Sequence, residues 1–435
     1  MKPTEEVIFV LHKLNNSDIN YALMRNLDFL INQNIEVGKD VDILVQKKDI
    51  NKIKQIFKEL NYKKQPISPF SKHLGFAKYL PNNFKLIKFH FHIDGISGRN
   101  VQYLDGQILL SRKKPILNYH TLSDEDTLIN LIFHYKDAYE NKLKTLLDLN
   151  LDYDYIEKTL TSKTNSKISK KMTKFVKLKD MNSLLSTRKK LKNALFNSPT
   201  KYISAGYTTI GSGIWKFSNL FKKSPMITFM GMDGAGKTTT TNEMIKILNK
   251  NHLKSALIYT GRGKNNLLPI QYFGRKFKKI EMKKDNSKLN NPNEYKIKKP
   301  STKKKIIYSL AAPIFALDLI IRYYVQIWSK RKTKEIVLTD RYSTDLLLMK
   351  NVPEWEKRFL YAISPKPSKV IYLYNDIEVL HKRKPNHPFD DLQRQEKLFK
   401  KINSKLEPIK IKNEDLGETK KIVSEIIFEQ LLKSW

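Results

Sequence analysis

The residues best suited to chemistry lie in the segment Gly231-Met-Asp-Gly-Ala-Gly-Lys-Thr238, which satisfies the spacing G-x-x-x-x-G-K-[ST]. Its glycines let successive backbone N–H groups turn into one concavity, and a helix that starts there adds the positive end of its dipole. A lysine and a hydroxyl at the end of such a loop suit the β and γ phosphates of a nucleotide and a Mg²⁺ ion. We therefore expect Lys237 to contact phosphate and Thr238 to bind Mg²⁺.

The elements around this loop predict a parallel sheet. Met226 to Met230 is a short apolar run of the kind found in fully buried strands, and TTTTNEMIKILNK after the loop has helical spacing. A helix is also expected from Glu418 to Leu432. Strands alternating with helices predict an α/β doubly wound sheet, which binds ligands at the carboxyl ends of its strands. The other expected strands are Ser255 to Tyr259, Glu335 to Thr339, Lys369 to Tyr374 and Pro408 to Lys412.

The region from Ser224 to Trp435 resembles the thymidylate kinases, P-loop kinases of nucleoside monophosphates. Their loop reads G-x-[DE]-G-x-G-K-[ST]-T, and a second match is Asp340-Arg341-Tyr342 after the strand VLT. The resemblance implies phosphoryl transfer from Mg²⁺-ATP to a nucleoside monophosphate, with thymidylate the first candidate. Asp340 would then bind Mg²⁺ with Thr238, and Arg341 would hold the acceptor phosphate. The implied ATP-binding residues are Gly231, Asp233, Gly234, Ala235, Gly236, Lys237, Thr238 and Thr239.

Further site residues follow from the resemblance alone. Arg262, Arg322 and Tyr323 would contact the acceptor together with Asp233, and Arg383 would belong to a basic lid that closes over the phosphates. Each of these basic residues could equally be a solvated surface charge. The chain departs from the family in having Gly261-Arg262-Gly263 in place of an Arg-Glu-Pro element, and a Lys-rich insertion at about 275–305. A different phosphorylated acceptor or a sugar therefore stays open.

The amino-terminal region carries a second possible site. Asp40 and Asp42 lie two residues apart at the start of an apolar strand, so they share a face and suit a divalent metal. Asp94, at the end of KLIKFHFHID, is a candidate third carboxylate. The pattern resembles nucleotidyltransferases and implies an α+β domain with two-metal chemistry. Their Gly-Ser pair is missing, however, so the acids could simply face water or the activity could be lost. His90 and His92 would suit a metal, but histidines on a polar strand face are more often bystanders.

These patterns predict residues 1–155 as the nucleotidyltransferase-like domain, 156–223 as a basic helical linker and 224–435 as the P-loop domain. The formal charge of +38 fits attraction to nucleotides, nucleic acid or an anionic membrane, or equally a lysine-rich proteome. No nucleic-acid-binding motif accompanies the charge. The sequence has no cysteine and no signal-peptide pattern at its start. We expect a cytoplasmic protein, with peripheral membrane contact through the linker and insertion as an option.

The apolar stretch from Ile306 to Trp328 is long enough for a membrane span, but it contains Asp318, Arg322 and Pro313. Ionised groups at mid-bilayer cost several kcal/mol, so a buried or interfacial helix is the expectation. Three functions are compatible with the sequence. The first is the kinase, the second is a bifunctional kinase and nucleotidyltransferase, and the third is an ATP-gated module that docks on a membrane or polyanion.

Overall fold

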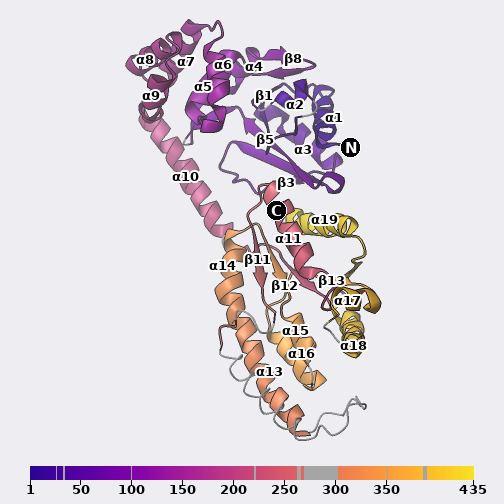
Figure 1. Ribbon diagram of the computed structural model, residues 1–435. Helices are drawn as coiled ribbons and strands as arrows, with labels where there is room; N and C mark the ends of the chain where they lie inside the picture. Colours follow the sequence, from indigo (N-terminus) through magenta and orange to yellow (C-terminus); the bar gives the residue numbers. More distant parts are fainter. Residues whose placement is uncertain are drawn as a thin grey trace. The chain divides into compact units, whose positions relative to one another are not determined.

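The chain forms two compact units (Figure 1). The computed structural model describes residues 1–25, 27–32, 35–98, 100–219, 222–261, 266–268, 302–349, 351–385 and 389–435. One unit is Met1–Leu220 with Trp435, and the other is Phe221–Ser434. Each unit has its own sheet and its own apolar core, so each is described by itself.

The amino-terminal unit is built on a mixed sheet of seven strands in the order β3-β4-β5-β2-β1-β9-β8. Neighbours β2 and β5 run parallel, while β4 and β5, and β1 and β2, run antiparallel. Such a mixture of directions makes this an α+β unit, as expected. A separate hairpin is formed by β6 (Gly95–Gly98) and β7 (Val101–Asp105). The sheet strands are β1 (Tyr21–Leu23), β2 (Val41–Val45), β3 (Lys63–Lys64), β4 (His73–Leu80), β5 (Lys85–Ile93), β8 (Lys114–Ile116) and β9 (Tyr119–Thr121).

Alternation along the strands gives this sheet two buried faces. On β2, Ile43 joins a core with helices α1 (Pro3–Asn15) and α3 (Ile50–Glu59), whereas Leu44 joins a core with α5 (Asp124–His134). Ser123 is the N-cap of α5, since its Oγ accepts a hydrogen bond from the Asp126 N–H. Shorter helices are α2 (Asp28–Ile31), α4 (Gly106–Ser111) and α6 (Glu140–Leu147).

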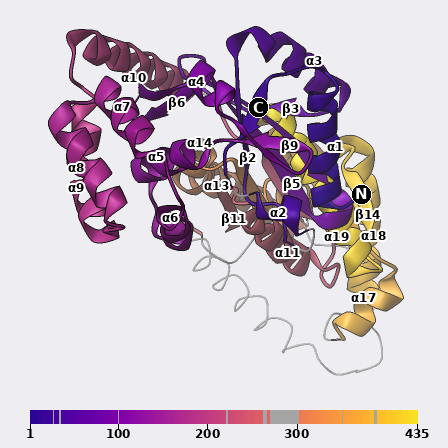
Figure 2. The ribbon, with the colours of Figure 1, turned by 90° about the horizontal axis from the view of Figure 1, so that it is seen from above.

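The segment predicted as a linker is instead part of the amino-terminal core. It forms α7 (Tyr153–Lys163), α8 (Ser166–Lys177), α9 (Met181–Ala194) and α10 (Pro199–Asn219), of which α7, α8 and α9 pack side by side (Figure 2). The helices α7, α8 and α9 each bury a narrow apolar stripe and leave most of their lysines exposed, whereas α10 buries only Ala205 and Gly211. Met172 and Val176, one turn apart on α8, are fully buried. The expected helices are present, but they complete the amino-terminal core instead of only linking two domains.

The carboxy-terminal unit contains a parallel sheet of five strands in the order β11-β12-β10-β13-β14, which confirms the predicted doubly wound fold. β10 lies at the centre, between β12 and β13, and the chain changes winding direction on either side of it. That is the switch point at which such sheets bind ligands. The strands are β10 (Met226–Met230), β11 (Ser255–Tyr259), β12 (Ile336–Asp340), β13 (Lys369–Tyr374) and β14 (Ile409–Lys412), within one residue of expectation.

Helices cover this sheet and extend beyond it. α11 (Lys237–Lys250) follows the glycine-rich loop and packs against α19 (Leu416–Ser434), which includes the predicted final helix. α13 (Thr302–Arg322) packs against α16 (Glu354–Ile363) and continues through the π-helical segment η4 (Tyr323–Trp328) into α14 (Ser329–Thr333). The remaining helices are α15 (Thr344–Leu347), α17 (Ile377–Arg383) and α18 (Phe389–Leu406).

One described helix, Tyr308–Thr333, is long and apolar enough to cross a membrane by length and composition, and 44% of its most apolar window is buried inside the protein. The core helix of a soluble protein meets the same criteria. Asp318 and Arg322, one turn apart in this helix, are both fully buried and form an ion pair with a 2.8 Å separation. This pairing agrees with the expectation of a helix packed within the protein.

Candidate active site

The glycine-rich loop connects the carboxyl end of β10 to the first turn of α11, as its spacing requires. Three of its glycines have positive φ angles: 155° at Gly231, 90° at Gly234 and 85° at Gly236. A Cβ at Gly231 would lie 2.2 Å from the Leu373 carbonyl oxygen, and one at Gly236 would lie 2.2 Å from Asn413 Nδ2. The loop therefore tolerates no side chain at these two positions. Asn413 also donates to the Ala235 carbonyl at 2.8 Å and fixes the loop from behind.

The side chain of Lys237 folds back onto the glycine-rich loop that precedes it. Its Nζ donates to the carbonyl oxygens of Gly231 at 3.0 Å and Met232 at 2.8 Å, and the side chain is buried. Burial, followed by the positive charge of Arg341, lowers the pKa of Lys237 to about 8. Among the described residues no carboxylate forms an ion pair with this buried ammonium group, which therefore favours an anionic ligand. The loop is thus prepared for phosphate.

Thr238 and Asp340 meet at the edge of the sheet where a magnesium ion is expected. The Thr238 hydroxyl donates to Asp340 Oδ2 at 2.7 Å, although the residues come from α11 and from the end of β12. The other oxygen of this buried carboxylate, Oδ1, has no hydrogen-bond partner in the described part of the chain. A hydroxyl and a carboxylate with a free oxygen are hard ligands that suit Mg²⁺. These residues therefore fit the predicted ion.

Arg341 follows Asp340 and turns its guanidinium toward the loop. Its backbone is left-handed, with φ 67°, which re-aims the side chain at the end of β12. Nη2 is hydrogen-bonded to Asp233 Oδ1 of the loop, and Nη1 lies 3.8 Å from Asp345 Oδ2. Burial alone would lower the pKa of Arg341, but the charges of Asp345 and Asp233 raise it overall. The guanidinium is therefore a permanent cation beside the phosphate loop.

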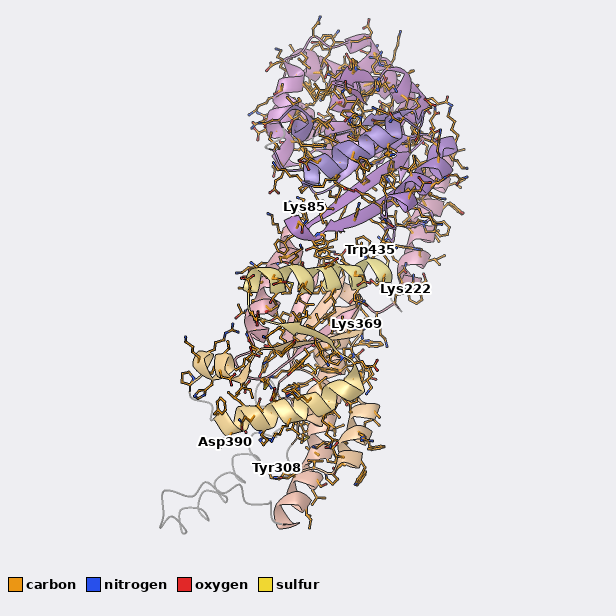
Figure 3. The ribbon with its side chains drawn as sticks, turned by 90° about the vertical axis from the view of Figure 1, so that its right-hand side faces the viewer. Lys85, Lys222, Tyr308, Lys369, Asp390 and Trp435 are labelled. Atoms are coloured by element: carbon orange, nitrogen blue, oxygen red, sulfur yellow. The ribbon has the colours of Figure 1, made fainter. Side chains whose placement is uncertain are left out.

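A cavity of about 370 Å³ opens beside this arginine. The loop and Arg341 bound one side, and helices α13 and α18 bound the other. Figure 3 labels Tyr308 on α13 and Asp390 next to cavity residue Asp391 on α18. Arg394 of α18 is paired with Asp391, with Nη2 and Oδ1 2.6 Å apart. The lining residues are Gly231, Asp233, Tyr308, Arg341, Leu348, Met349, Asp391, Arg394, Gln395, Leu398 and Phe399.

Other residues expected at this site lie elsewhere. Arg322 does not line the cavity, because its guanidinium is fully buried against Asp318, whose Oδ1 accepts the N–H groups of Leu267 and Leu268. Tyr323 is also buried, and its hydroxyl accepts a hydrogen bond from Arg331 Nη1 at 3.1 Å. Both residues therefore brace the helix instead of reaching the cavity.

Two of the expected residues are at the margin of the site. Arg383, in the last turn of α17, donates to the Asn413 carbonyl at 3.3 Å and is not a lining residue of the cavity. Thr239 is exposed on α11. Arg262 and most of the basic insertion lie outside the described residues. Asp345 was not predicted as a site residue. Its position four residues after Arg341 could have predicted the ion pair between them.

The three predicted carboxylates of the amino-terminal unit do not form one cluster. In the parallel pairing of β2 with β5, Asp42 lies opposite His90. Asp94 is four residues farther along, so the strand separates it from Asp42 by about 13 Å. Its Oδ1 accepts the Lys47 N–H at 2.8 Å instead. Asp40 lies before β2, farther still from Asp94.

Asp42 itself is enclosed by basic side chains. Arg25 Nε lies 2.6 Å from Oδ2, and the rings of His90 and His92 lie 3.2 and 3.4 Å from Oδ1. Burial would raise the pKa of Asp42, but the hydrogen bonds from His90, His92 and Arg25 hold this pKa far below its usual range. A carboxylate already engaged on both oxygens does not offer the open pair of acids that a two-metal site needs.

Comparisons with known proteins give two partial likenesses. No protein-family model matches the sequence. The signal recognition particle receptor FtsY of Sulfolobus acidocaldarius is 28% identical over 141 residues, which is 32% of this chain and 33% of that protein. The chain thus spans about a third of that relative. A solved structure of thymidylate kinase from Candida albicans is 18% identical, covers 48% of this chain and 93% of that one, and gives a TM-score of 0.32.

Neither match extends over the whole chain. The carboxy-terminal unit has a P-loop doubly wound fold, as the loop geometry and the parallel sheet of this chain show.

Proposed function

We propose that the carboxy-terminal unit transfers the γ-phosphoryl group of Mg²⁺-ATP to a nucleoside monophosphate, with thymidylate as the first candidate. The observation that supports it is Arg341, which stands between the phosphate loop and a 370 Å³ cavity. A guanidinium can hold an acceptor phosphate through two hydrogen bonds beside the donor. The cavity is within the size range of small-molecule sites.

The lining of the cavity favours a nucleobase over a bare sugar. Tyr308, Leu348 and Phe399 supply apolar and aromatic surface, while Arg394 and Gln395 supply hydrogen-bonding groups. A planar base needs both kinds of contact, whereas the hydroxyls of a sugar would be left unpaired against the apolar wall. A phosphorylated sugar is therefore the second candidate acceptor.

Each residue has a separate role in this proposal. Lys237 and the loop N–H groups bind the β and γ phosphates, and Arg341 aligns the acceptor phosphate with them. Mg²⁺, held by Thr238 and Asp340, would neutralise the charge on the donor phosphates. Asp233 keeps Arg341 in place until the acceptor arrives. Arg394 on α18 would add positive charge when that helix closes over the cavity.

The test is an ATP-turnover assay with a panel of nucleoside monophosphates and sugar phosphates. Lys237→Ala should reduce turnover at least about 100-fold, in the range of losing one transition-state contact. Arg341→Ala should raise KM for the acceptor more than KM for ATP. Lys246→Ala is the matched control, because this lysine is exposed on the same helix and forms an ion pair with Glu243. Acceptor-independent turnover, or equal rates for Lys237→Ala and wild type, would refute the kinase proposal.

A further inference from the structure

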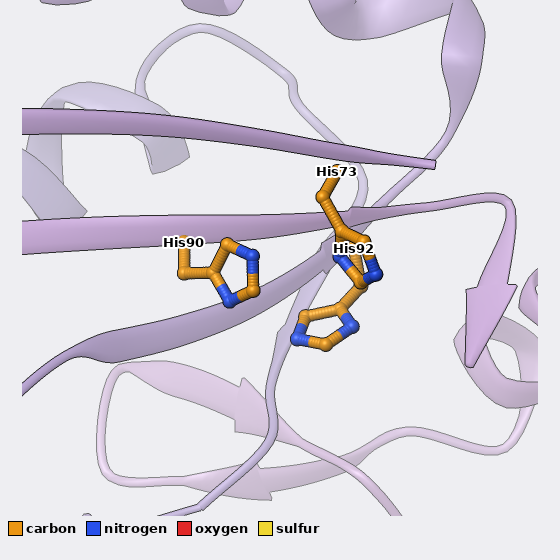
Figure 4. Close-up of side chains that lie close together, drawn as sticks. All are labelled: His73, His90 and His92. Atoms are coloured by element: carbon orange, nitrogen blue, oxygen red, sulfur yellow. The ribbon is translucent and has the colours of Figure 1, made fainter. Parts of the chain in front are cut away.

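Three histidines of the amino-terminal unit converge on one face of its sheet. His90 and His92 are two residues apart on β5 and so point to the same side. His73 on the antiparallel neighbour β4 lies directly opposite His92. One ring nitrogen from each of the three lies within 4.8 Å of the others, as Figure 4 illustrates. The arrangement therefore follows from strand register and is not a chance contact of surface loops.

The three rings lie close together, and two of their nitrogens make no hydrogen bond to the described residues. The ring centroids are 4.7 to 4.9 Å apart, and two of the nitrogens, His73 Nδ1 and His92 Nδ1, are buried with no hydrogen-bond partner in the described structure. His92 is only 7% exposed. A buried polar atom that makes no hydrogen bond costs free energy, so these two neighbouring nitrogens call for a common partner.

Asp42 provides the carboxylate that commonly hydrogen-bonds the second ring nitrogen of a metal-binding histidine. Its Oδ1 lies 3.2 Å from His90 Nδ1 and 3.4 Å from His92 Nε2. A carboxylate bound to one ring nitrogen fixes the tautomer and leaves the other nitrogen, with its lone pair, for a metal. Arg25 holds the second oxygen of Asp42 at 2.6 Å, which keeps the carboxylate oriented.

We propose that His73, His90 and His92 bind a divalent transition metal, with Zn²⁺ as the first candidate. Imidazole nitrogens suit Zn²⁺, whereas Mg²⁺ and Ca²⁺ prefer oxygen. In a tetrahedral zinc site with bonds of about 2.0–2.1 Å, ligand nitrogens lie roughly 3.4 Å apart. Side-chain rotations of the three rings can close the present separations. Three protein ligands leave the fourth position for water, as in catalytic zinc sites.

The experiment uses the full chain after treatment with a chelator, titrated with Co²⁺ and followed by visible absorption. Four-coordinate Co²⁺ at nitrogen ligands absorbs strongly, whereas the oxygen ligands Thr238 and Asp340 would give a weak six-coordinate spectrum. The expected result is an intense band that saturates at one equivalent and disappears when Zn²⁺ displaces the Co²⁺. An absent or weak band in the wild type would overturn the proposal, and this outcome requires no variant.

Variants then assign the ligands. His92→Gln and His73→Gln should abolish the intense band, while Asp42→Asn should keep the band and weaken affinity about 10- to 100-fold, because it acts through the histidines. His134→Gln is the control, since His134 is also partly buried but is bonded to the Ser97 carbonyl. Circular dichroism checks that each variant is folded. Equal loss of the band in His134→Gln and His92→Gln would contradict the assignment.

Discussion

The buried pair of Asp318 and Arg322 provides a test that separates structure from substrate binding. Both side chains are fully buried, the charged atoms lie 2.8 Å apart, and Asp318 Oδ1 also accepts two backbone N–H groups. Removing either charge leaves the other one buried without compensation. The two perturbations are Asp318→Asn, which keeps the side-chain size, and Arg322→Gln, which removes the charge and shortens the side chain.

The magnitude follows from the burial of the pair. Breaking a buried ion pair by removing one partner costs about 3–5 kcal/mol. Against a total unfolding free energy of about 5–15 kcal/mol, either single variant should be severely destabilised. In the double variant Asp318→Asn/Arg322→Gln, two neutral amides replace the charges. Its loss should therefore be about 1–2 kcal/mol, which implies a coupling free energy of several kcal/mol between the two positions.

The assay is urea denaturation of the four proteins in this cycle, followed by ATP turnover on the folded double variant. Trp328 and Trp355 report on the carboxy-terminal unit. If the pair is structural, the double variant should keep the acceptor KM within about threefold of the wild type. That is below a tenfold change, which corresponds to about 1.4 kcal/mol. Single variants that lose under about 1 kcal/mol would refute the buried pair, because that is the range of exposed pairs. A tenfold rise in acceptor KM would instead restore Arg322 as an acceptor ligand.

Three other changes test separate parts of the molecule. Gly236→Ala places a Cβ against Asn413 at a residue whose φ is 85°. Left-handed backbone strain of about 1–2 kcal/mol then adds to the clash. The affinity for ATP, measured by calorimetry, should fall at least about tenfold. Asp340→Asn should raise the Mg²⁺ concentration needed for half-maximal turnover at least about tenfold without shifting the unfolding midpoint; an unchanged Mg²⁺ requirement would contradict its role. Burial and the charge of Arg25 lower the pKa of His134 to about 4, so the folded state binds fewer protons than the unfolded state below about pH 6.5. The contribution of His134 to the free energy of unfolding should fall as pH decreases from 7 and level off below 4, with about 1.4 kcal/mol lost at pH 5.5. The variant His134→Gln should lack this pH-dependent loss. If the pH profiles of the two proteins run parallel, His134 makes no such contribution.

The carboxy-terminal site was predictable because its signals are local. The loop spacing, the apolar strands before it and Asp340-Arg341 each sit within a few residues of the element that positions them. The strand bounds agreed within one residue for the same reason. Arg322 was placed incorrectly, because the direction of a side chain in a long apolar helix depends on which neighbouring segment covers it. Here the backbone of Leu267 and Leu268 covers Asp318, and the pair turns inward.

The amino-terminal unit shows what sequence spacing omits. Asp42 and Asp94 are both acids at strand ends, but β2 runs parallel to β5, so its register sets Asp42 opposite His90 and leaves Asp94 beyond the strand. His73 joins the histidines only through the antiparallel pairing of β4 with β5. Register between strands far apart in sequence depends on the packing of whole faces. No local pattern could therefore have distinguished an acid cluster from a histidine cluster on this sheet.

The same distinction explains why the acceptor was the least predictable part of the proposed kinase site. Donor phosphates are bound mainly by backbone N–H groups of one short loop, whose glycine spacing is visible in sequence. The acceptor cavity is walled by side chains from α13, the segment after α15, and α18, which are far apart in sequence and meet only after folding. Exchanging Tyr308, Leu348 or Phe399 would change the fit of a base without altering the loop. If the proposed kinase activity is correct, substitutions on α13 and α18 should therefore change acceptor specificity more readily than substitutions there change ATP binding.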